Sequence, residues 1–163
     1  MTRKLVRHAT ADWFSAAQIP GLDHVYPGKP REILWADYAT GSSAHMCQAY
    51  VLVDRIPEVR LAGGGPTPPQ GQKEIRHQVR VMVWFRSTDA DWLEGQDEFD
   101  DIVEAMVEQL RYGRTLGRPD VILQAGEFAS GIVQQYEEPD ADAGGVMFTG
   151  ATIAFQATTV INS

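Results

Sequence analysis

The densest group of side chains able to do chemistry is a run of carboxylates between residues 89 and 108. Paired carboxylates can bind a magnesium ion or act as general acid and base, which would suit a metal-dependent hydrolase. The same spacing fits the solvated outer face of an amphipathic helix, where acidic side chains near the start favour the helix dipole. We favour the helix face and keep the hydrolase as the alternative. The run comprises Asp89, Asp91, Glu94, Asp97, Glu98, Asp100, Asp101, Glu104 and Glu108.

Two segments resemble ligand-binding loops but depart from them at decisive positions. The segment from Gly63 to Lys73 is rich in glycine, yet Gln72 stands where a phosphate-binding loop needs lysine. The segment from Asp140 to Gly145 begins like a calcium loop, but its twelfth position is Ala151 instead of glutamate. We therefore expect a hairpin tip and an acidic loop, and we predict no bound cofactor at either.

The other catalytic residue types form no recognisable arrangement. Cys47 lies in an apolar strand pattern, which favours an inert buried thiol over a nucleophile, and no Gly-x-Ser-x-Gly motif occurs. As the only cysteine, it cannot form an intrachain disulfide, which fits a reducing compartment. No two histidines have metal-ligand spacing. The histidines are His8, His24, His45 and His77, the last of which we expect to be partly buried. The sequence predicts no catalytic residue, no metal site and no enzyme activity.

Size and composition predict one globular domain spanning residues 1–163. Hydrophobic residues make up 44% and charged residues 22% of the chain, which is ordinary for a domain with a real core. No run is long and apolar enough for a membrane span, and no apolar segment follows the basic start, so we expect neither an anchor nor a secretory signal. The net charge of −8 argues against tight binding of nucleic acid.

A strand followed by a helix should form the centre of the fold. Residues 74–86 alternate between apolar and polar side chains, and from Trp92 to Leu110 the apolar residues recur at helical spacing. Ser87, Thr88 and Asp89 offer N-caps, and Gly113 is placed as a C′ residue.

The remaining segments add a second helix and further strands. Residues 3–17 have helical spacing, and residues 61–72, with glycines and prolines, separate two strands as the tip of a long antiparallel hairpin. The order predicts an α+β domain with a mostly antiparallel sheet and two helices packed on one face. Other expected strands are 32–35, 45–57, 121–123, 132–136 and 146–161, with turns at 23–31 and an acidic loop at 137–145.

Several segments together resemble the small tail-terminator or tail-completion proteins of long-tailed, siphovirus-like phages, particularly those of actinobacterial hosts. The resemblance covers most of the chain, and its motifs are mainly structural, so no catalytic residue is carried over. The segments are Ile19-Pro20-Gly21-Leu22-Asp23-His24-Val25-Tyr26-Pro27, Arg80 to Thr88, Gln96 to Val103, Ile122 to Glu127 and the last strand.

The resemblance implies a virion structural protein, assembled in the host cytoplasm, that forms a hexameric ring at the neck of the particle. Such a ring caps the tail tube and docks it to the head-completion or connector protein. DNA passes through the ring without specific binding, and an acidic wall would repel phosphates. A head-completion or stopper protein is the nearest alternative, followed by a tail-tube subunit and a binding module outside phages.

Two segments are the candidate assembly contacts. The glycine- and proline-rich tip and the acidic loop would give such a cap two chemically different ends, one for the tube and one for the connector. The candidates are Gly63, Gly64, Gly65, Pro66, Pro68, Pro69 and Gln70 in the tip, and Glu137, Glu138, Asp140 and Asp142 in the loop.

Overall fold

The chain folds as an α+β domain in which two helices pack against a mixed, mostly antiparallel sheet. The computed structural model describes residues 2–31, 44–55, 59–60, 72–88, 92–113, 115–118, 123–125, 131–141 and 145–162. The elements in chain order are α1 (Thr2–Ala17), β1 (His24–Tyr26), β2 (His45–Arg55), β3 (Val59–Arg60), β4 (Gln72–Ser87), α2 (Trp92–Tyr112), β5 (Leu123–Ala125), β6 (Val133–Tyr136), β7 (Asp140–Ala141) and β8 (Met147–Asn162).

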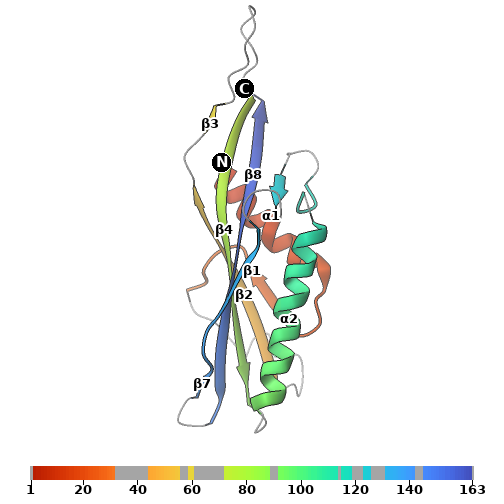
Figure 1. The fold of residues 1–163 in the computed structure, drawn as a ribbon, viewed down its shortest axis with the longest axis vertical. Coiled ribbons are helices and arrows are strands. Elements are labelled where there is room, and N and C mark those ends of the chain that lie inside the picture. Colours follow the sequence, from red (N-terminus) through yellow and green to blue (C-terminus); the bar gives the residue numbers. More distant parts are fainter. Residues whose placement is uncertain are drawn as a thin grey trace, which may run out of the picture.

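Two long antiparallel strands, β4 and β8, form the axis of the molecule (Figure 1). They pair over their whole length, from Gln72 opposite Asn162 to Ser87 opposite Met147. β2 pairs with the other side of β4, from His45 opposite Ser87 to Arg55 opposite His77, so β2 and β4 are the arms of the predicted long hairpin. Of the predicted tip, residues 61–71 lie outside the described residues, and Gln72 is the first residue of β4.

The two sides of the sheet end in different kinds of strand. On one side, β1 runs parallel to β2, with Val25 opposite Ala49. On the other side, β7, β6 and β5 pair in turn with successive parts of β8. Both α1 and α2 cover the same face of this sheet, α1 mainly over β1 and β2 and α2 over β4 and β8. On this face, α1 therefore lies toward the β1 edge of the sheet, and α2 lies toward the edge formed by β5, β6 and β7.

The core lies between the sheet and the helices. Alternate residues of β2, β4 and β8 point inward, which is the period expected of strands with one buried face. From α2, the residues at three- and four-residue steps complete the core, namely Phe99, Ile102, Val103, Met106 and Leu110, together with Val107. The alternation in the sequence thus predicted correctly which face of each long strand is buried.

His77 is fully buried in this core, where the sequence predicted partial burial. Its Nε2 lies 3.3 Å from the hydroxyl of Thr159 on the neighbouring strand. A buried imidazole needs polar neighbours, because an unsatisfied ring nitrogen costs free energy. The interruption of the apolar face is therefore accommodated by a polar residue of β8 two positions beyond Ala157, the residue that lies opposite His77.

Two segments expected to be turns or loops contain short strands. Residues 24–26 form β1 within the predicted turn region, and Asp140–Ala141 form β7 within the predicted acidic loop. Both are too short for an alternating pattern, and they exist because long neighbours, β2 and β8, offer unpaired backbone groups. The expected strand at 32–35 lies outside the described residues, as do residues 121–122 of the strand whose described part is β5.

Of the residues predicted to cap α2, Ser87 is the last residue of β4, and Asp89 lies outside the described residues. Thr88 does not cap the helix; its hydroxyl and its N–H both donate to the carbonyl oxygen of Ala44, closing the end of the β2–β4 ladder. Gly113 follows the helix as expected, but the reason for glycine is a close approach, since an added Cβ would lie 2.4 Å from the Trp13 ring. Within the described part of the chain, no helix combines the length and the apolar character needed to cross a membrane.

Candidate functional site

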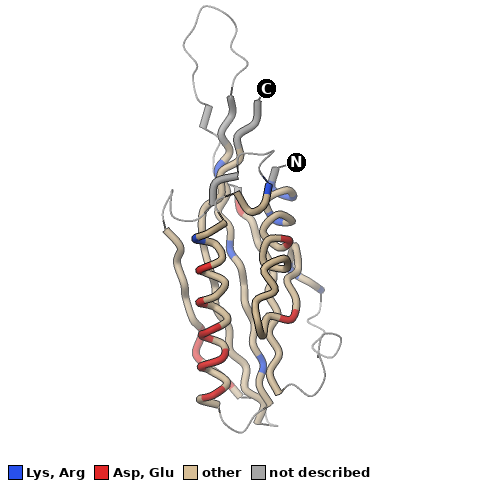
Figure 2. Tube along the Cα trace, turned by 90° about the vertical axis from the view of Figure 1, so that its right-hand side faces the viewer, with Lys and Arg blue, Asp and Glu red and all other residues tan. Residues whose placement is uncertain are grey.

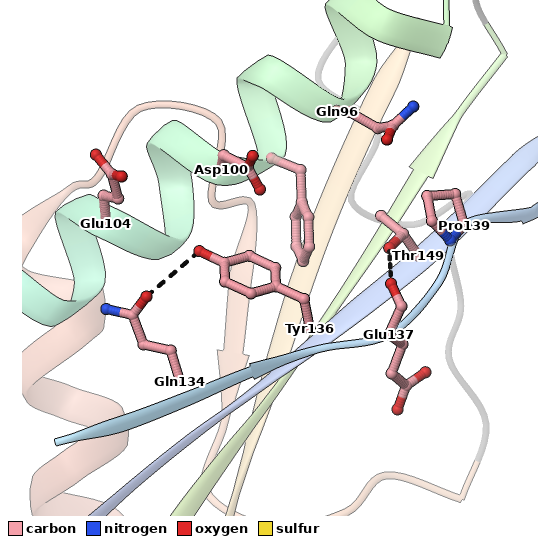
Figure 3. Close-up of a pocket in the computed structure, with 9 residues that line it drawn as sticks. Gln96, Asp100, Glu104, Gln134, Tyr136, Glu137, Pro139 and Thr149 are labelled. Atoms are coloured by element: carbon pink, nitrogen blue, oxygen red, sulfur yellow. Dashed lines mark hydrogen bonds between the residues drawn. The ribbon is translucent and has the colours of Figure 1, made fainter.

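An open groove of about 470 Å³ lies between α2 and β6 (Figure 3). One wall comes from α2 and the other from β6 and the residues that follow it. The groove is lined by Gln96, Phe99, Asp100, Glu104, Gln134, Tyr136, Glu137, Pro139 and Thr149. We call this feature the α2–β6 groove.

Tyr136 forms the centre of the β6 wall. Because Tyr136 pairs with Ala151, whose side chain is in the core, it projects toward α2 and meets the Phe99 ring edge to face at 6.2 Å. Its hydroxyl donates to Oε1 of Gln134 at 3.4 Å, and 43% of the residue remains exposed. The ring therefore presents an aromatic surface and a phenol to the groove.

The α2 wall is strongly acidic. Burial raises the pKa of Asp100, and the neighbouring carboxylates of Asp97, Glu104 and Asp101 raise it further. Burial likewise raises the pKa of Tyr136, with Asp100 and Glu104 adding to the shift. None of the described ion pairs, which join Arg80 to Asp54, Arg111 to Glu108 and His45 to Glu98, includes Asp100 or Glu104.

Hydrogen bonds to β8 hold the wall that follows β6. The N–H of Glu137 donates to the carbonyl oxygen of Gly150 at 2.8 Å, and the Thr149 hydroxyl donates to the carbonyl oxygen of Glu137 at 3.1 Å. Figure 3 shows the Glu137 carboxylate turned away from Tyr136, so this residue contributes mainly its backbone. The wall after β6 is thus fixed to β8 rather than left as a free loop.

A second polar cluster joins the turn at residues 19–23 to α2. The Asp23 N–H donates to the carbonyl oxygen of Cys47, and the Cys47 N–H donates back to Oδ2 of Asp23, both at 2.8 Å. His45 Nδ1 contacts Oε2 of Glu98, and Gly21 lies against Ile102. Burial raises the pKa of Asp23, the hydrogen bond from Cys47 lowers it, and Glu98 raises it. These contacts position the turn and the helix against each other.

The candidate contacts from the sequence divide between described and undescribed segments. Glu137, Glu138 and Asp140 are exposed, and of these only Glu137 lines the groove. Asp142 and all the candidate contacts in the tip lie outside the described part of the chain. The candidates in the tip are Gly63, Gly64, Gly65, Pro66, Pro68, Pro69 and Gln70. Sequence reasoning missed Tyr136, Gln134 and Gln96. The one available signal was an aromatic residue in a short polar strand before an acidic segment.

The groove chemistry suits a positively charged group. Two carboxylates without an ion-pair partner, a phenol ring and side-chain amides can accept hydrogen bonds from Lys or Arg and stack against the cation. Within the described ranges, no three His, Cys, Asp or Glu side chains are placed to hold a metal ion. Cys47 is fully buried, and burial raises the pKa of its thiol well above the ordinary value, which makes it a poor nucleophile.

Comparison with known proteins gives no family: the sequence matches no family model and no curated protein.

Proposed function

We propose that this protein is a tail-terminator ring subunit, which caps the tail tube of a long-tailed phage and docks it to the head connector. The observation that carries the proposal is the packing of the segments behind the family resemblance. The turn at Ile19 to Asp23 lies against Glu98 and Ile102 of α2 and is hydrogen-bonded to Cys47 of β2. Residues Arg80 to Ser87 of the second segment belong to β4, which lies between β2 and the last strand, β8. The described parts of these segments therefore belong to one packed unit.

The shape of the subunit is compatible with that role. The helices cover one face of a long sheet, and the two sides of the sheet end in different strands. A subunit with unlike sides can join its neighbours through heterologous contacts, which close into a ring when the rotation between copies allows it. A ring that matches the tube on only one of its ends would stop further layers from adding.

Phage particles assembled without this protein provide the test. Each tube layer recreates the surface on which the next layer adds, so tails without their cap should be overlong and headless in electron micrographs. Tails of normal length that fail to join heads would instead assign the protein to a head-completion or stopper role. Normal infectious particles would remove it from the head–tail junction.

A further inference from the structure

The two edges of the sheet carry charges of opposite sign, one edge lying beside α2 and the other beside α1. The α2 side has Glu94, Asp97, Glu98, Asp100, Asp101, Glu104 and Glu108 in one helix, against Arg111 alone. The α1 side has Arg3, Lys4 and Arg7 in its helix against Asp12, and Lys29 and Arg31 follow β1. Figure 2 shows the separation, with red positions along α2 and blue positions at the start of α1. We call Arg3, Lys4, Lys29 and Arg31 the basic edge; all four are exposed.

On the acidic side, β6 is an edge strand of the sheet. β6 pairs with β8 on one side, and no other described strand pairs with it. All four of its residues are exposed, including Val133 at 58%. An exposed edge strand presents backbone N–H and C=O groups that an extended segment of another chain can pair with. The α2–β6 groove lies directly beside this edge, so an added segment would run beneath the carboxylates of Asp100 and Glu104.

The basic edge offers the groove cations on a backbone segment that favours an extended conformation. Lys29 and Arg31 belong to a segment containing Pro30, and proline favours an extended backbone. Gly28 lies beside the Arg7 guanidinium of α1, at 3.5 Å from an added Cβ, and Lys29, Pro30 and Arg31 then line a small depression together with Tyr50 and Trp84. The chain thus carries, on opposite sides of its sheet, an acidic groove and cations able to enter it.

We propose that the α2–β6 groove receives the basic edge of a second copy of this chain, so that copies join head to tail. The contact deepens the proposed ring function and rests on it, because it names the surfaces through which neighbouring subunits meet. Cations from the neighbour neutralise Asp100 and Glu104, relieving the repulsion among the α2 carboxylates, and Tyr136 packs against the incoming side chains. Because exposed charge pairs are screened by salt, the association weakens as ionic strength rises.

Charge reversal tests the contact in the full chain. In the variant Asp100→Lys/Glu104→Lys, both the groove and the basic edge carry positive charges. In the variant Lys29→Glu/Arg31→Glu, negative charges face each other when the groove meets the altered edge. Measured by analytical ultracentrifugation at low salt, each should associate at least about tenfold more weakly than the wild type, since like charges then face each other. An equimolar mixture of the two variants should regain association, because unlike sides meet again. Circular dichroism confirms that each variant is folded.

A matched control separates the groove from general charge effects. Asp101→Lys/Glu108→Lys makes the same change of charge on the same helix, outside the residues that line the groove, and should weaken association much less than Asp100→Lys/Glu104→Lys, because these side chains do not contact the incoming cations. As a second measurement, Glu104→Cys in one copy and Arg31→Cys in another should form a disulfide on mixing. Cys47 does not interfere, because it is buried.

Several results would overturn the proposal. They are reversed variants that associate as well as the wild type, a mixture of the two variants that stays monomeric, and a wild-type chain that stays monomeric up to millimolar concentration. Binding of purified tail-tube protein in the groove, lost in Asp100→Lys/Glu104→Lys without any self-association, would assign the groove to a different partner. None of these results decides the capping function, which the tail lengths in micrographs test separately, since a ring can close through other surfaces.

Discussion

The contact between Gly21 and Ile102 offers a sharp test of how the N-terminal turn is fixed to α2. Gly21 has φ +82°, and an added Cβ would lie 2.8 Å from Cδ1 of Ile102. Gly21→Ala should therefore destabilise the protein for two reasons. The left-handed backbone costs alanine about 1–2 kcal/mol, and the overpacking adds about 1–3 kcal/mol, giving about 2–5 kcal/mol in all. Urea unfolding followed by circular dichroism measures the loss as a lower midpoint.

Two further variants separate the causes. Gly145 has φ +80° with no neighbour within 4 Å of an added Cβ, so Gly145→Ala should show the backbone cost alone. Ile102→Val removes Cδ1 and should cost about 0.5–1.5 kcal/mol by itself. Combined with Gly21→Ala, it should relieve the overpacking, so the double variant is less destabilised than the sum of the singles by at least about 0.5 kcal/mol. Strict additivity, or equal losses for Gly21→Ala and Gly145→Ala, would refute the contact.

Two other predictions concern α2. Gly113→Ala should lower the thermal midpoint, because the added Cβ would lie 2.4 Å from the Trp13 ring. Combining it with Trp13→Leu should recover part of the loss. An unchanged midpoint for Gly113→Ala would contradict this packing. The pKa of Asp100 is raised in the folded state, so the folded protein holds the proton more tightly than the unfolded chain does. The stability that the protonated carboxyl contributes is full below the ordinary pKa of 3.8 and is lost as the pH rises above it. Asp100→Asn should therefore raise the thermal midpoint slightly at pH 7 and leave it unchanged near pH 3, with Asp12→Asn as the exposed control; an equal effect at both pH values would exclude the electrostatic cause.

The long elements were predictable because each buries one face over many residues. β2, β4 and β8 alternate at period two, and α2 repeats its apolar residues at helical spacing. One buried face over so many positions leaves little choice of register, since a shift by one residue would expose the whole core face. The α+β class, the hairpin arms and the common face of both helices followed from these patterns.

The short strands and the groove could not be predicted, for a different reason. β1 and β7 have two or three residues each and depend on longer neighbours. Asp100 and Tyr136 share a groove only because β6 docks on β8 beside α2, a pairing that no local pattern encodes. The predicted solvated face of α2 is confirmed for six carboxylates, which are exposed, whereas Glu98 is half-buried and contacts His45. The six are Glu94, Asp97, Asp100, Asp101, Glu104 and Glu108, and Asp89 and Asp91 lie outside the described residues. Local sequence therefore predicted the kind of surface and left open what stands opposite it.

The position of the carboxylates along α2 indicates that helix stability alone does not explain them. Glu94 lies in the first turn, where the dipole favours a negative charge, but Glu104 and Glu108 lie in the second half, where it does not. Asp97 and Asp101, Asp100 and Glu104, and Glu104 and Glu108 are like-charged pairs four residues apart. Each such pair destabilises a helix by about 0.2–0.5 kcal/mol. The described opposite-charge pair along this helix is Glu108 with Arg111. A helix that retains this repulsion gains most when cations are brought to it from outside, which is the arrangement that a neighbour's basic edge supplies.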